Sequence, residues 1–389
     1  MNKILALPHI QKFAQIFAHE IENFRIVGGA VRDDLLKKQI KDIDIATKFT
    51  VEELIELCLE KQLKFKPTGL KYGTITLFLT GEIIEITSLR SDIKTDGRHC
   101  EIAYASDFAL DAKRRDFTIN ALYLDFKGKI YDYFDGRADL RQKKLIFIGD
   151  VDARIREDYL RILRLFRFKA NLEGFSISAT TLIKCAHHKD KLYKLSAERI
   201  LSELTKLLNG ANYADSLALM SEYQICDFVF NYNNLDKIKY FNEVNGENSN
   251  INVFLYNLSS GKPLNNLVKT LKVSKTQYKE ILFLENNHKQ YNSFAPTELT
   301  KIIFLHGRDN CKNLYLNYIL QNSLRVDKII LANIANIEIP VFSVTGYDLQ
   351  NRGYKKGKIL GAKLSELKNR WLDSDFVLSK TQLLHLISN

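Results

Sequence analysis

Two aspartates alternate with two isoleucines in the run Asp42-Ile43-Asp44-Ile45. Because successive side chains of a β-strand point to opposite faces, this pattern predicts a strand with its isoleucines toward a core and both carboxylates on the other face. Two carboxylates on one face repel each other, and their oxygens suit a divalent cation such as Mg²⁺. Taken alone, the pattern fits a solvated acidic strand end better than a metal site.

A glycine pair precedes the acidic strand. Residues 24–27 form a short apolar segment that predicts a strand, and it leads through Gly28-Gly29 into a helix expected at residues 30–38. Glycines at a strand-to-helix turn let backbone N–H groups approach a phosphate, and Arg32 can reach the same group. A tight turn explains the glycines by themselves. Together, the glycine pair and the two aspartates predict a phosphate site beside a metal site.

A third carboxylate, Glu85, lies on the strand predicted at residues 83–89. A turn at Thr80-Gly81 joins this strand to another at residues 74–79. Glu85 joins the aspartates only if its strand neighbours theirs. In phosphoryl transfer, two metal ions about 3.5–4 Å apart activate the attacking hydroxyl and stabilise the leaving oxygen, and clustered carboxylates are typical of such sites.

Two adjacent arginines begin the run RRDFTINAL at residues 114–122. Arg114 and Arg115 can bind phosphates. Asp116 and Asn120 are four residues apart, so in a helix they would share one face, where they could hydrogen-bond a ribose or fix the arginines. A helix that starts here, with the Asp116 carboxylate as its cap, is the equally weighted alternative.

Arginines recur at three-residue steps in the run EDYLRILRLFRF, which begins at Glu157. The run lies in a helix predicted at residues 154–172, on which Asp158, Arg161 and Arg164 span roughly 120° of one side. The alternative is a surface helix with Glu157–Arg161 and Asp158–Arg161 ion pairs, which contribute little stability.

The combination of Asp158 and Arg161 also suits a nucleobase. Cytosine and adenine each present an amino donor beside a ring-nitrogen acceptor, so a carboxylate accepts from the first while an arginine donates to the second. Guanine and uracil present a carbonyl in place of the amino group, and that carbonyl would face the carboxylate acceptor to acceptor. These two side chains therefore predict selection of CTP and ATP without a nucleic-acid template.

These runs, in this order, resemble the signatures of the class II tRNA nucleotidyltransferase and bacterial poly(A) polymerase family. The matching segments are VGGAVRD…KDIDIAT, RRDFTINAL, EDYLRILRLFRF and the LSAERI…E run that starts at Leu195. The resemblance is strong over residues 24–208 and weak over residues 210–340. It implies a DNA-polymerase-β-like palm and the template-independent addition of CCA to the 3′ end of tRNA, with CTP and ATP as substrates and Mg²⁺ as cofactor.

The resemblance also implies roles for individual residues. Asp42 and Asp44 are expected to hold Mg²⁺, and Glu85 joins them as a catalytic carboxylate on the looser match EITSLR. The run that starts at Leu195 is expected to support the base-binding helix. The residues expected to bind the nucleotide are Gly28, Gly29, Arg32, Arg115, Asp116, Asn120, Asp158, Arg161, Arg164 and Arg167.

Predicted strands and helices alternate before residue 150, and helical periodicity dominates after it. The expected fold class is α+β, with a polymerase-β-like palm built on a mixed sheet and an all-helical C-terminal portion. We expect a nucleotidyltransferase head at residues 1–140, a helical nucleobase-binding neck at 141–210, and a helical tRNA-binding body and tail at 211–389. The polar stretch at residues 90–113 is expected to form a flexible loop.

Composition favours a polyanionic partner and a reducing compartment. The net charge of +11 at pH 7 suits nucleic acid, with an anionic membrane surface as the competing partner. The five cysteines are scattered and form no CxxC pair, so neither zinc nor a disulfide framework is expected. The sequence predicts no signal peptide and no membrane span, which favours a cytoplasmic protein without membrane association. The oligomeric state stays open.

Three alternatives to CCA addition stay open. A poly(A) polymerase shares the same signatures, and an enzyme that adds only CC or only A is a variant for which residues 90–113 would be the discriminating segment. A non-catalytic RNA-binding relative is disfavoured by the intact carboxylates and arginines. In the C-terminal region, contacts to the tRNA backbone or a generic basic turn both fit Arg352, Lys355, Lys356 and Lys358.

Overall fold

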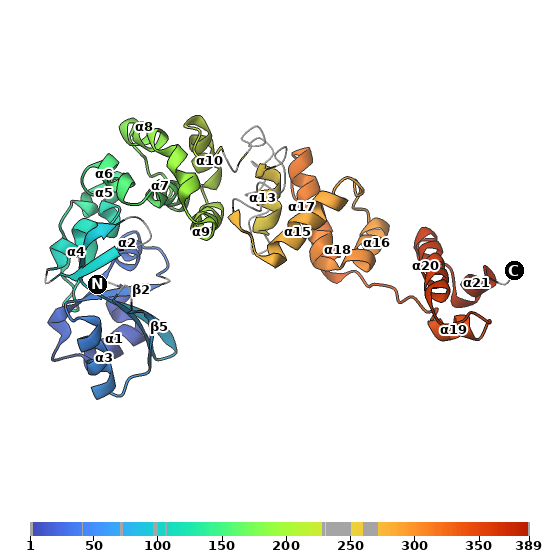
Figure 1. Ribbon diagram of the computed structural model, residues 1–389, viewed down its shortest axis with the longest axis horizontal. Coiled ribbons are helices and arrows are strands. Elements are labelled where there is room, and N and C mark those ends of the chain that lie inside the picture. Colours follow the sequence, from blue (N-terminus) through green and yellow to red (C-terminus); the bar gives the residue numbers. More distant parts are fainter. Residues whose placement is uncertain are drawn as a thin grey trace. The chain divides into compact units, whose positions relative to one another are not determined.

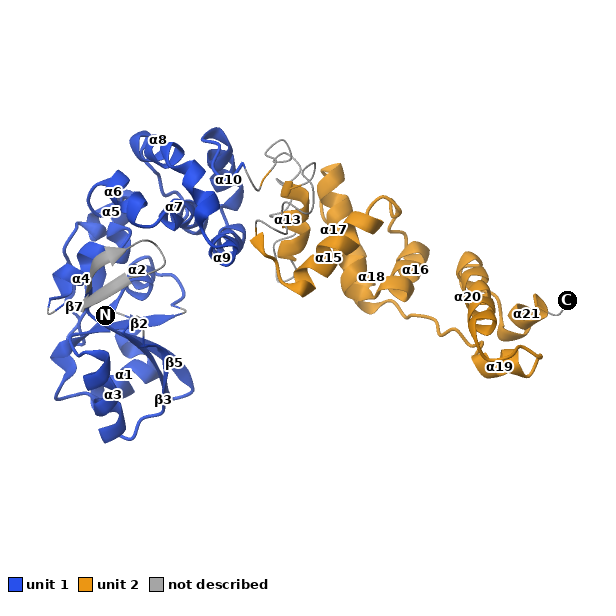
Figure 2. Cartoon of the chain, viewed as in Figure 1, with its two compact units in different colours: residues 1–229 blue, residues 230–389 orange. Residues whose placement is uncertain are grey.

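The computed structural model describes residues 3–40, 42–70, 73–95, 100–105, 107–227, 230, 250–259 and 271–387, with backbone only at 91–95 and 100–104. The chain divides into two compact units, residues 1–229 and residues 230–389 (Figure 2). The first unit carries both sheets of the described structure and several helices, whereas every regular element described in the second is a helix.

The first unit is built on a seven-stranded mixed sheet with strand order β3-β4-β5-β2-β1-β8-β9. Its strands are β1 (Phe24–Val27), β2 (Ile43–Thr47), β3 (Phe65–Gly69), β4 (Thr74–Leu79), β5 (Glu82–Ser88), β8 (Leu122–Leu124) and β9 (Ile130–Asp132). Strands β2 and β5 pair in parallel, and the other neighbours pair antiparallel. This places β2, which carries the aspartate pattern, at the centre of the sheet (Figure 1).

Helices connect and cover these strands, and then continue alone. The helices of the sheet region are α1 (Pro8–Ile16), α2 (Gly29–Leu35), α3 (Val51–Glu60), α4 (Phe108–Arg114) and α5 (Gly136–Gln142). The helices that follow are α6 (Val151–Glu157), α7 (Leu160–Asn171), α8 (Ala179–His187), α9 (Ala197–Leu208) and α10 (Tyr213–Glu222). Short 3₁₀ helices lie at Lys3–Ala6, Ile21–Asn23, Thr118–Asn120 and Lys189–Lys194. The expected α+β class is confirmed, with a mixed sheet first and helices after it.

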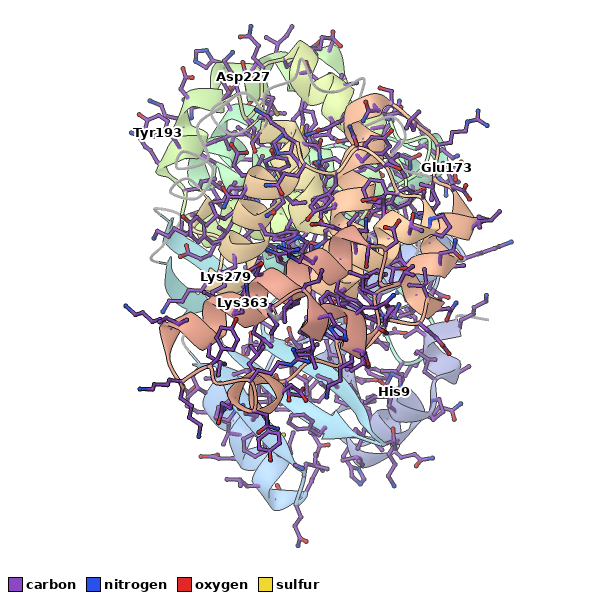
Figure 3. All side chains as sticks on the ribbon, turned by 90° about the vertical axis from the view of Figure 1, so that its right-hand side faces the viewer. His9, Glu173, Tyr193, Asp227, Lys279 and Lys363 are labelled. Carbon is purple, nitrogen blue, oxygen red and sulfur yellow. The ribbon has the colours of Figure 1, made fainter. Side chains whose placement is uncertain are left out.

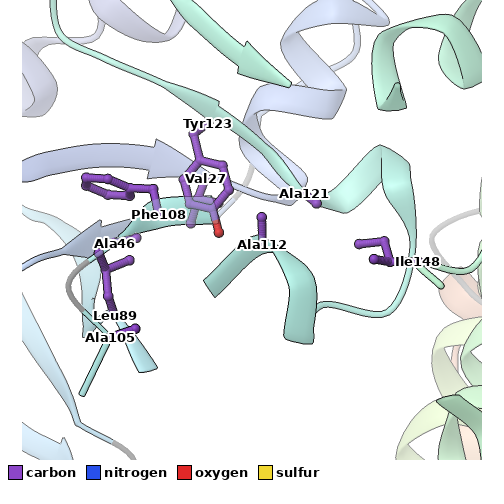
Figure 4. Packing of buried hydrophobic residues seen from close by; sticks show 9 residues of the cluster. All are labelled: Val27, Ala46, Leu89, Ala105, Phe108, Ala112, Ala121, Tyr123 and Ile148. Atoms are coloured by element: carbon purple, nitrogen blue, oxygen red, sulfur yellow. The ribbon is translucent and has the colours of Figure 1, made fainter. Parts of the chain in front are cut away.

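One buried cluster fixes helix α4 against the central strands (Figure 4). Phe108 and Ala112 of α4 pack with Val27 of β1 and Tyr123 of β8, and each of these side chains is at most 2% exposed. Phe108 and Tyr123 meet edge to face, with ring centroids 5.7 Å apart, a favoured aromatic arrangement. Because α4 ends at Arg114, this packing also fixes where Arg115 leaves the helix.

Helix α7 buries one face against α9 and α10. Ile162, Leu163 and Phe166 are completely buried, and the Ser216 hydroxyl of α10 donates to the Phe166 carbonyl at 2.7 Å. Gly210 follows α9 and lies so close to Ala170 that a Cβ there would be 2.6 Å from the Ala170 carbonyl oxygen. The arginine-bearing helix is therefore held closely by its neighbours.

The second unit contains helices throughout its described residues. They are α13 (Ile251–Ser259), α15 (Lys275–Asn287), α16 (Pro296–His306), α17 (Arg308–Asn322), α18 (Lys328–Asn336), α19 (Gly346–Gln350), α20 (Lys358–Asp373) and α21 (Lys380–His385). A core around Trp371 joins α19, α20 and α21. Charged side chains such as Lys279 of α15 project outward from these helices (Figure 3).

Regular elements occupy much of residues 90–113, where the sequence predicts a loop. Strand β6 (Arg90–Thr95) pairs with β7 (Cys100–Tyr104) in a separate two-stranded sheet, and α4 follows. Helix α4 begins here because the Asp107 carboxylate accepts a hydrogen bond from the Ala109 N–H at 3.0 Å and caps its first turn. Residues 96–99 and 106 of the predicted loop lie outside the described residues.

The single helix predicted at residues 154–172 is also wrong, because the chain breaks between α6 and α7. Asp158 adopts extended backbone angles, φ −155° and ψ 106°. Its carboxylate accepts from the Leu160 N–H at 3.1 Å, so a local side-chain bond competes with helix continuation. The predicted helix at residues 30–38 is present as α2, but it ends at Leu35.

Candidate active site

Asp44 lies in strand β2 and Asp42 immediately precedes that strand, and the two aspartates alternate with isoleucines as predicted. Ile43 and Ile45 are at most 4% exposed, whereas Asp42 and Asp44 are exposed at the opposite face. The parallel pairing of β2 with β5 puts Asp44 directly beside Glu85 in register. The condition for a third carboxylate is therefore met, since Glu85 is on the neighbouring strand and is also exposed.

The electrostatics of Asp44 are consistent with a cation at this position. The pKa of Asp44 is raised, first by burial within the surrounding protein and then by the Glu85 and Asp42 charges, against an opposing effect of Arg115. Asp44 is accessible to solvent, but it lines a cavity. The protein around that cavity reduces the hydration of the carboxylate and so raises its pKa. Cations relieve this kind of repulsion between carboxylates.

The donor set fits a metal that also binds substrate oxygens. Within the described part of the chain, no group of three or more His, Cys, Asp or Glu side chains converges closely enough to hold a metal alone. Mg²⁺ in nucleotide sites takes one or two carboxylates and completes its shell with water and phosphate oxygens. Asp42 and Asp44 therefore fit that mode of binding, with Glu85 beside them.

The glycine turn lies between two arginines. Gly28 has φ +76°, a conformation that favours glycine, and a Cβ there would lie 3.4 Å from Arg115 Nη1. A Cβ at Gly29 would lie 3.6 Å from Arg32 Nη2. Backbone without side chains, flanked by guanidinium groups, is what close approach of an anion requires.

Arg115 belongs to a buried network that was not predicted from the sequence. The Asp111 carboxylate is 1% exposed and accepts from Arg115 Nη2 at 3.1 Å. The Tyr123 hydroxyl donates to Asp111 Oδ2 at 2.6 Å and accepts from Arg115 Nε at 3.0 Å. The four-residue spacing of Asp111 and Arg115 is the signal that indicates such a pair from sequence.

Asp116 and Asn120 contact each other without sharing a helix. Helix α4 ends at Arg114 and the next turn starts at Thr118, so the predicted helical face at these two residues is wrong. The turn still brings Asn120 Nδ2 to Asp116 Oδ1 at 3.2 Å. The pair is almost fully buried.

Two arginines from other elements bind this pair. Arg164 Nε donates to Asp116 Oδ2 at 2.7 Å, and Arg32 Nη1 donates to Asn120 Oδ1 at 2.7 Å. Burial acts to raise the pKa of Asp116, but Arg164 and the local hydrogen bonds outweigh it, and the pKa is lowered. Asp116 and Asn120 were expected either to hydrogen-bond a ribose or to fix the arginines, and these contacts agree with the second role. The contacts link α2, the turn after α4, and α7.

Asp158 and Arg161 lie together at the start of α7 but bind different partners. Asp158 Oδ2 accepts from Arg199 Nη2 at 2.6 Å. Arg161 Nη1 donates to Glu157 Oε2 at 2.9 Å, and its Nη2 donates to the Arg114 carbonyl at 3.3 Å. The Glu157–Arg161 pair expected of a surface helix is present. Burial, and then Arg154, lowers the pKa of Arg161.

Arg164 and Arg167 share the buried carboxylate of Glu203. Arg167 Nη1 lies 3.2 Å from Glu203 Oε2, and Arg164 Nη1 lies 3.8 Å from Glu203 Oε1. The Arg167 guanidinium also stacks over the Phe168 ring, 4.4 Å from its centroid. The segment from Leu195 thus supplies both Arg199 and Glu203 as partners for residues of the EDYLRILRLFRF run.

A cavity of about 530 Å³ opens beside the carboxylates. Asp42 and Asp44 line it together with Gly29 and Arg32 from α2. Its far wall comes from the ends of α7 and α9, and the residues there are Arg167, Phe168, Asn171, Leu172, Lys206 and Asn209. The cavity is large enough for a nucleotide or for the end of an RNA strand.

Similarity to known proteins decides the family. A "Poly A polymerase head domain" model matches residues 24–146, and a "Probable RNA and SrmB- binding site of polymerase A" model matches residues 174–235. The mitochondrial CCA tRNA nucleotidyltransferase 1 of Mus musculus is 33% identical to the chain, over 97% of the chain and 89% of that relative. This chain belongs to the CCA-adding tRNA nucleotidyltransferase family.

Other members agree with this placement. The CCA-adding enzyme of Staphylococcus haemolyticus is 31% identical, over 86% of the chain and 82% of that relative. The Bacillus stearothermophilus CCA-adding enzyme, solved in complex with CTP, has the same fold, with a TM-score of 0.81, 22% identity and 98% coverage of both chains. A Thermotoga maritima CCA-adding enzyme solved with tRNA has a TM-score of 0.69.

Membership makes the chain an enzyme of the nucleotidyltransferase class, and CCA-adding nucleotidyltransferases are generally metal-dependent. No helix among the described residues is long and apolar enough to cross a membrane. The site described above therefore lies on the fold of a family whose chemistry calls for a cation and a nucleoside triphosphate.

Proposed function

We propose that the protein adds CCA to the 3′ end of tRNA from CTP and ATP, with Mg²⁺ as cofactor and pyrophosphate as the second product. The observation that carries this proposal is the register that puts Asp44 of β2 beside Glu85 of β5. Strand β1, which pairs with β2 on its other side, leads directly into the Gly28 turn. Family membership supports the same activity.

Asp42 and Asp44 would hold the metal, with Glu85 adding negative charge beside them. Bound Mg²⁺ would supply positive charge at the reacting phosphate and lower the pKa of the RNA 3′-hydroxyl. Gly28 and Gly29 leave open backbone for the triphosphate. Arg32 and Arg115 flank that backbone and would neutralise its charge.

Asp158 and Arg161 would select the base. A carboxylate has about four lone-pair positions, so Asp158 can accept an amino N–H while keeping its bonds to Leu160 N and Arg199. Arg161 would donate to the ring nitrogen of cytosine or adenine. Asp116 and Asn120 would fix Arg164 and Arg32. Arg164 and Arg167 would complete the nucleotide site.

The domain division expected from sequence completes the proposal: head at residues 1–140, neck at 141–210, and tRNA-binding body and tail at 211–389. We place the protein in the cytoplasm, because Cys58, Cys185, Cys226 and Cys311 are free thiols, as is usual in reducing compartments.

The experiment is to supply CTP and ATP singly and together to a tRNA lacking its last three nucleotides, and to sequence the product ends. We expect two C residues with CTP alone, and CCA with both nucleotides. A long A tail with ATP alone would indicate a poly(A) polymerase, and a stop after CC when both nucleotides are supplied would indicate a partial enzyme. No incorporation would favour a non-catalytic RNA-binding relative.

A further inference from the structure

Asp111 is a carboxylate buried beside the site and shared between two adjacent arginines. Arg114 Nε donates to Asp111 Oδ1 at 2.8 Å, and Arg115 Nη2 donates to Oδ2 at 3.1 Å. Burying a charge is costly unless it is paired and hydrogen-bonded. Here the two arginines and the Tyr123 hydroxyl outweigh burial, so the pKa of Asp111 is lowered and the carboxylate stays ionised.

Tyr123 closes this network from the core side. Its ring is completely buried and packs edge to face on Phe108 and Tyr133. The hydroxyl both donates to Asp111 Oδ2 and accepts from Arg115 Nε, at 2.6 and 3.0 Å. The ring is held by packing, so its oxygen is a fixed acceptor for the guanidinium.

These acceptors occupy one edge of the planar Arg115 guanidinium. Nε and Nη2 donate to Asp111 and Tyr123. The opposite atom, Nη1, faces the glycine turn, 3.4 Å from where a Cβ of Gly28 would lie. Among the described residues, no hydrogen-bond acceptor is found for Nη1. The Arg115 guanidinium is therefore held through Nε and Nη2, and the N–H groups of Nη1 are left to donate to a ligand.

We propose that Asp111 and Tyr123 are positioning residues, which hold the free edge of Arg115 against the Gly28 turn for a nucleoside triphosphate. The inference rests on the proposed function, and extends it from the residues that touch the nucleotide to those that orient them. Because Arg115 would contact phosphate, the effect is the same for CTP and ATP.

The test compares Tyr123→Phe with Tyr133→Phe. The first removes the hydroxyl that orients Arg115 and keeps the buried ring. The second is a matched control, since the Tyr133 hydroxyl also accepts from an arginine, Arg25 Nη1 at 2.7 Å, elsewhere in the same core. We expect Tyr123→Phe to raise KM for CTP and for ATP by about tenfold, with KM for tRNA unchanged. Tyr133→Phe should leave all three values unchanged.

A double-mutant cycle separates positioning from general destabilisation. If Tyr123 acts through Arg115, Tyr123→Phe should add no further loss in an Arg115→Ala background. A full additional tenfold loss there would overturn the proposal, as would unchanged KM values in the single variant. Asp111→Asn, which keeps the side-chain shape, should behave like Tyr123→Phe and takes its place if that variant does not fold.

The positioning role can be tested separately from CCA addition by measuring the binding of inorganic tripolyphosphate with Mg²⁺ in the absence of RNA. The Tyr123→Phe variant should bind this probe about tenfold more weakly than the wild type. Weaker binding supports the positioning role even if the wild type fails to extend tRNA. Equal binding by variant and wild type would refute it even if the wild type adds CCA.

Discussion

The raised pKa of Asp44 has a consequence for the stability of the metal-free protein. Burial and the Glu85 charge raise its pKa, so in the metal-free protein the ionised form is less favourable folded than unfolded. This penalty is present at pH values above the folded pKa and vanishes as the pH falls below the ordinary value. At neutral pH, therefore, the carboxylate destabilises the metal-free fold.

Asp44→Asn is accordingly predicted to raise the melting temperature of the metal-free protein at pH 7 by about 1–2 °C, after allowance for solvent screening. Mg²⁺ should stabilise the wild type and have less effect on the variant. Thermal unfolding with and without Mg²⁺ measures both effects. Asp152→Asn is the contrast, because Lys184 lowers the pKa of Asp152 and this substitution should not stabilise. A lower melting temperature for Asp44→Asn would contradict the account.

Asp158 is predicted to control which bases are accepted. Asp158→Asn replaces one acceptor by an amide donor, so discrimination against UTP and GTP should fall by about 10- to 100-fold. Single-turnover incorporation of each of the four nucleotides measures this. Asp150→Asn, at the cap of α6, serves as the control and should retain selectivity. Unchanged selectivity in Asp158→Asn would remove Asp158 from base recognition.

At the scale of elements, the close packing of α7 against the turn after α9 fixes the position of the arginines on α7. Gly210→Ala would force a Cβ to within 2.6 Å of the Ala170 carbonyl oxygen, and overpacking of this kind costs about 1–3 kcal/mol. We predict a lower melting temperature and a higher KM for both nucleotides. Gly361→Ala in α20 is the control, because nothing lies within 4 Å of its added Cβ, and it should be neutral or slightly stabilising. Equal stability of the two variants would contradict this packing role.

The elements that local sequence predicts are those with strong periodicity. Strand β4 (Thr74–Leu79) matches the predicted residues 74–79 because β-branched and large apolar residues fill the segment between the glycines at 73 and 81. The break at Asp158 was missed, since it depends on a side-chain bond to Leu160 N that competes with an otherwise good helical pattern.

The site was predictable where neighbours in sequence act together, and less so where distant elements meet. Asp42, Asp44 and the glycine turn follow from local patterns. The register of Asp44 with Glu85 depends on parallel pairing of β2 with β5, and strand pairing over such a separation is not encoded locally. Asp111 and Tyr123 were missed for the same reason, because α4 was expected to be loop and β8 meets it only in the fold.

At the scale of the whole molecule, the net charge of +11 predicts salt-sensitive binding of RNA. The exposed Lys355, Lys356 and Lys358 are candidate phosphate contacts. Replacing all three with alanine should weaken tRNA binding and reduce the slope of log affinity against log salt by roughly 2. Equilibrium binding across a salt series measures this, with exposed Lys12 of α1 as the control. An unchanged slope would show that these three lysines do not contact the RNA phosphates.

Asp42→Ala removes one of the two aspartates that are proposed to bind the metal needed for CCA addition. Wild type and variant are incubated with Mg²⁺, CTP, ATP and a tRNA lacking its last three nucleotides, and the product ends are sequenced. Thermal unfolding confirms that the variant is folded. We predict that the wild type adds C, C and A and stops, while the folded variant adds nothing. Substantial extension by Asp42→Ala would contradict the assignment of this site.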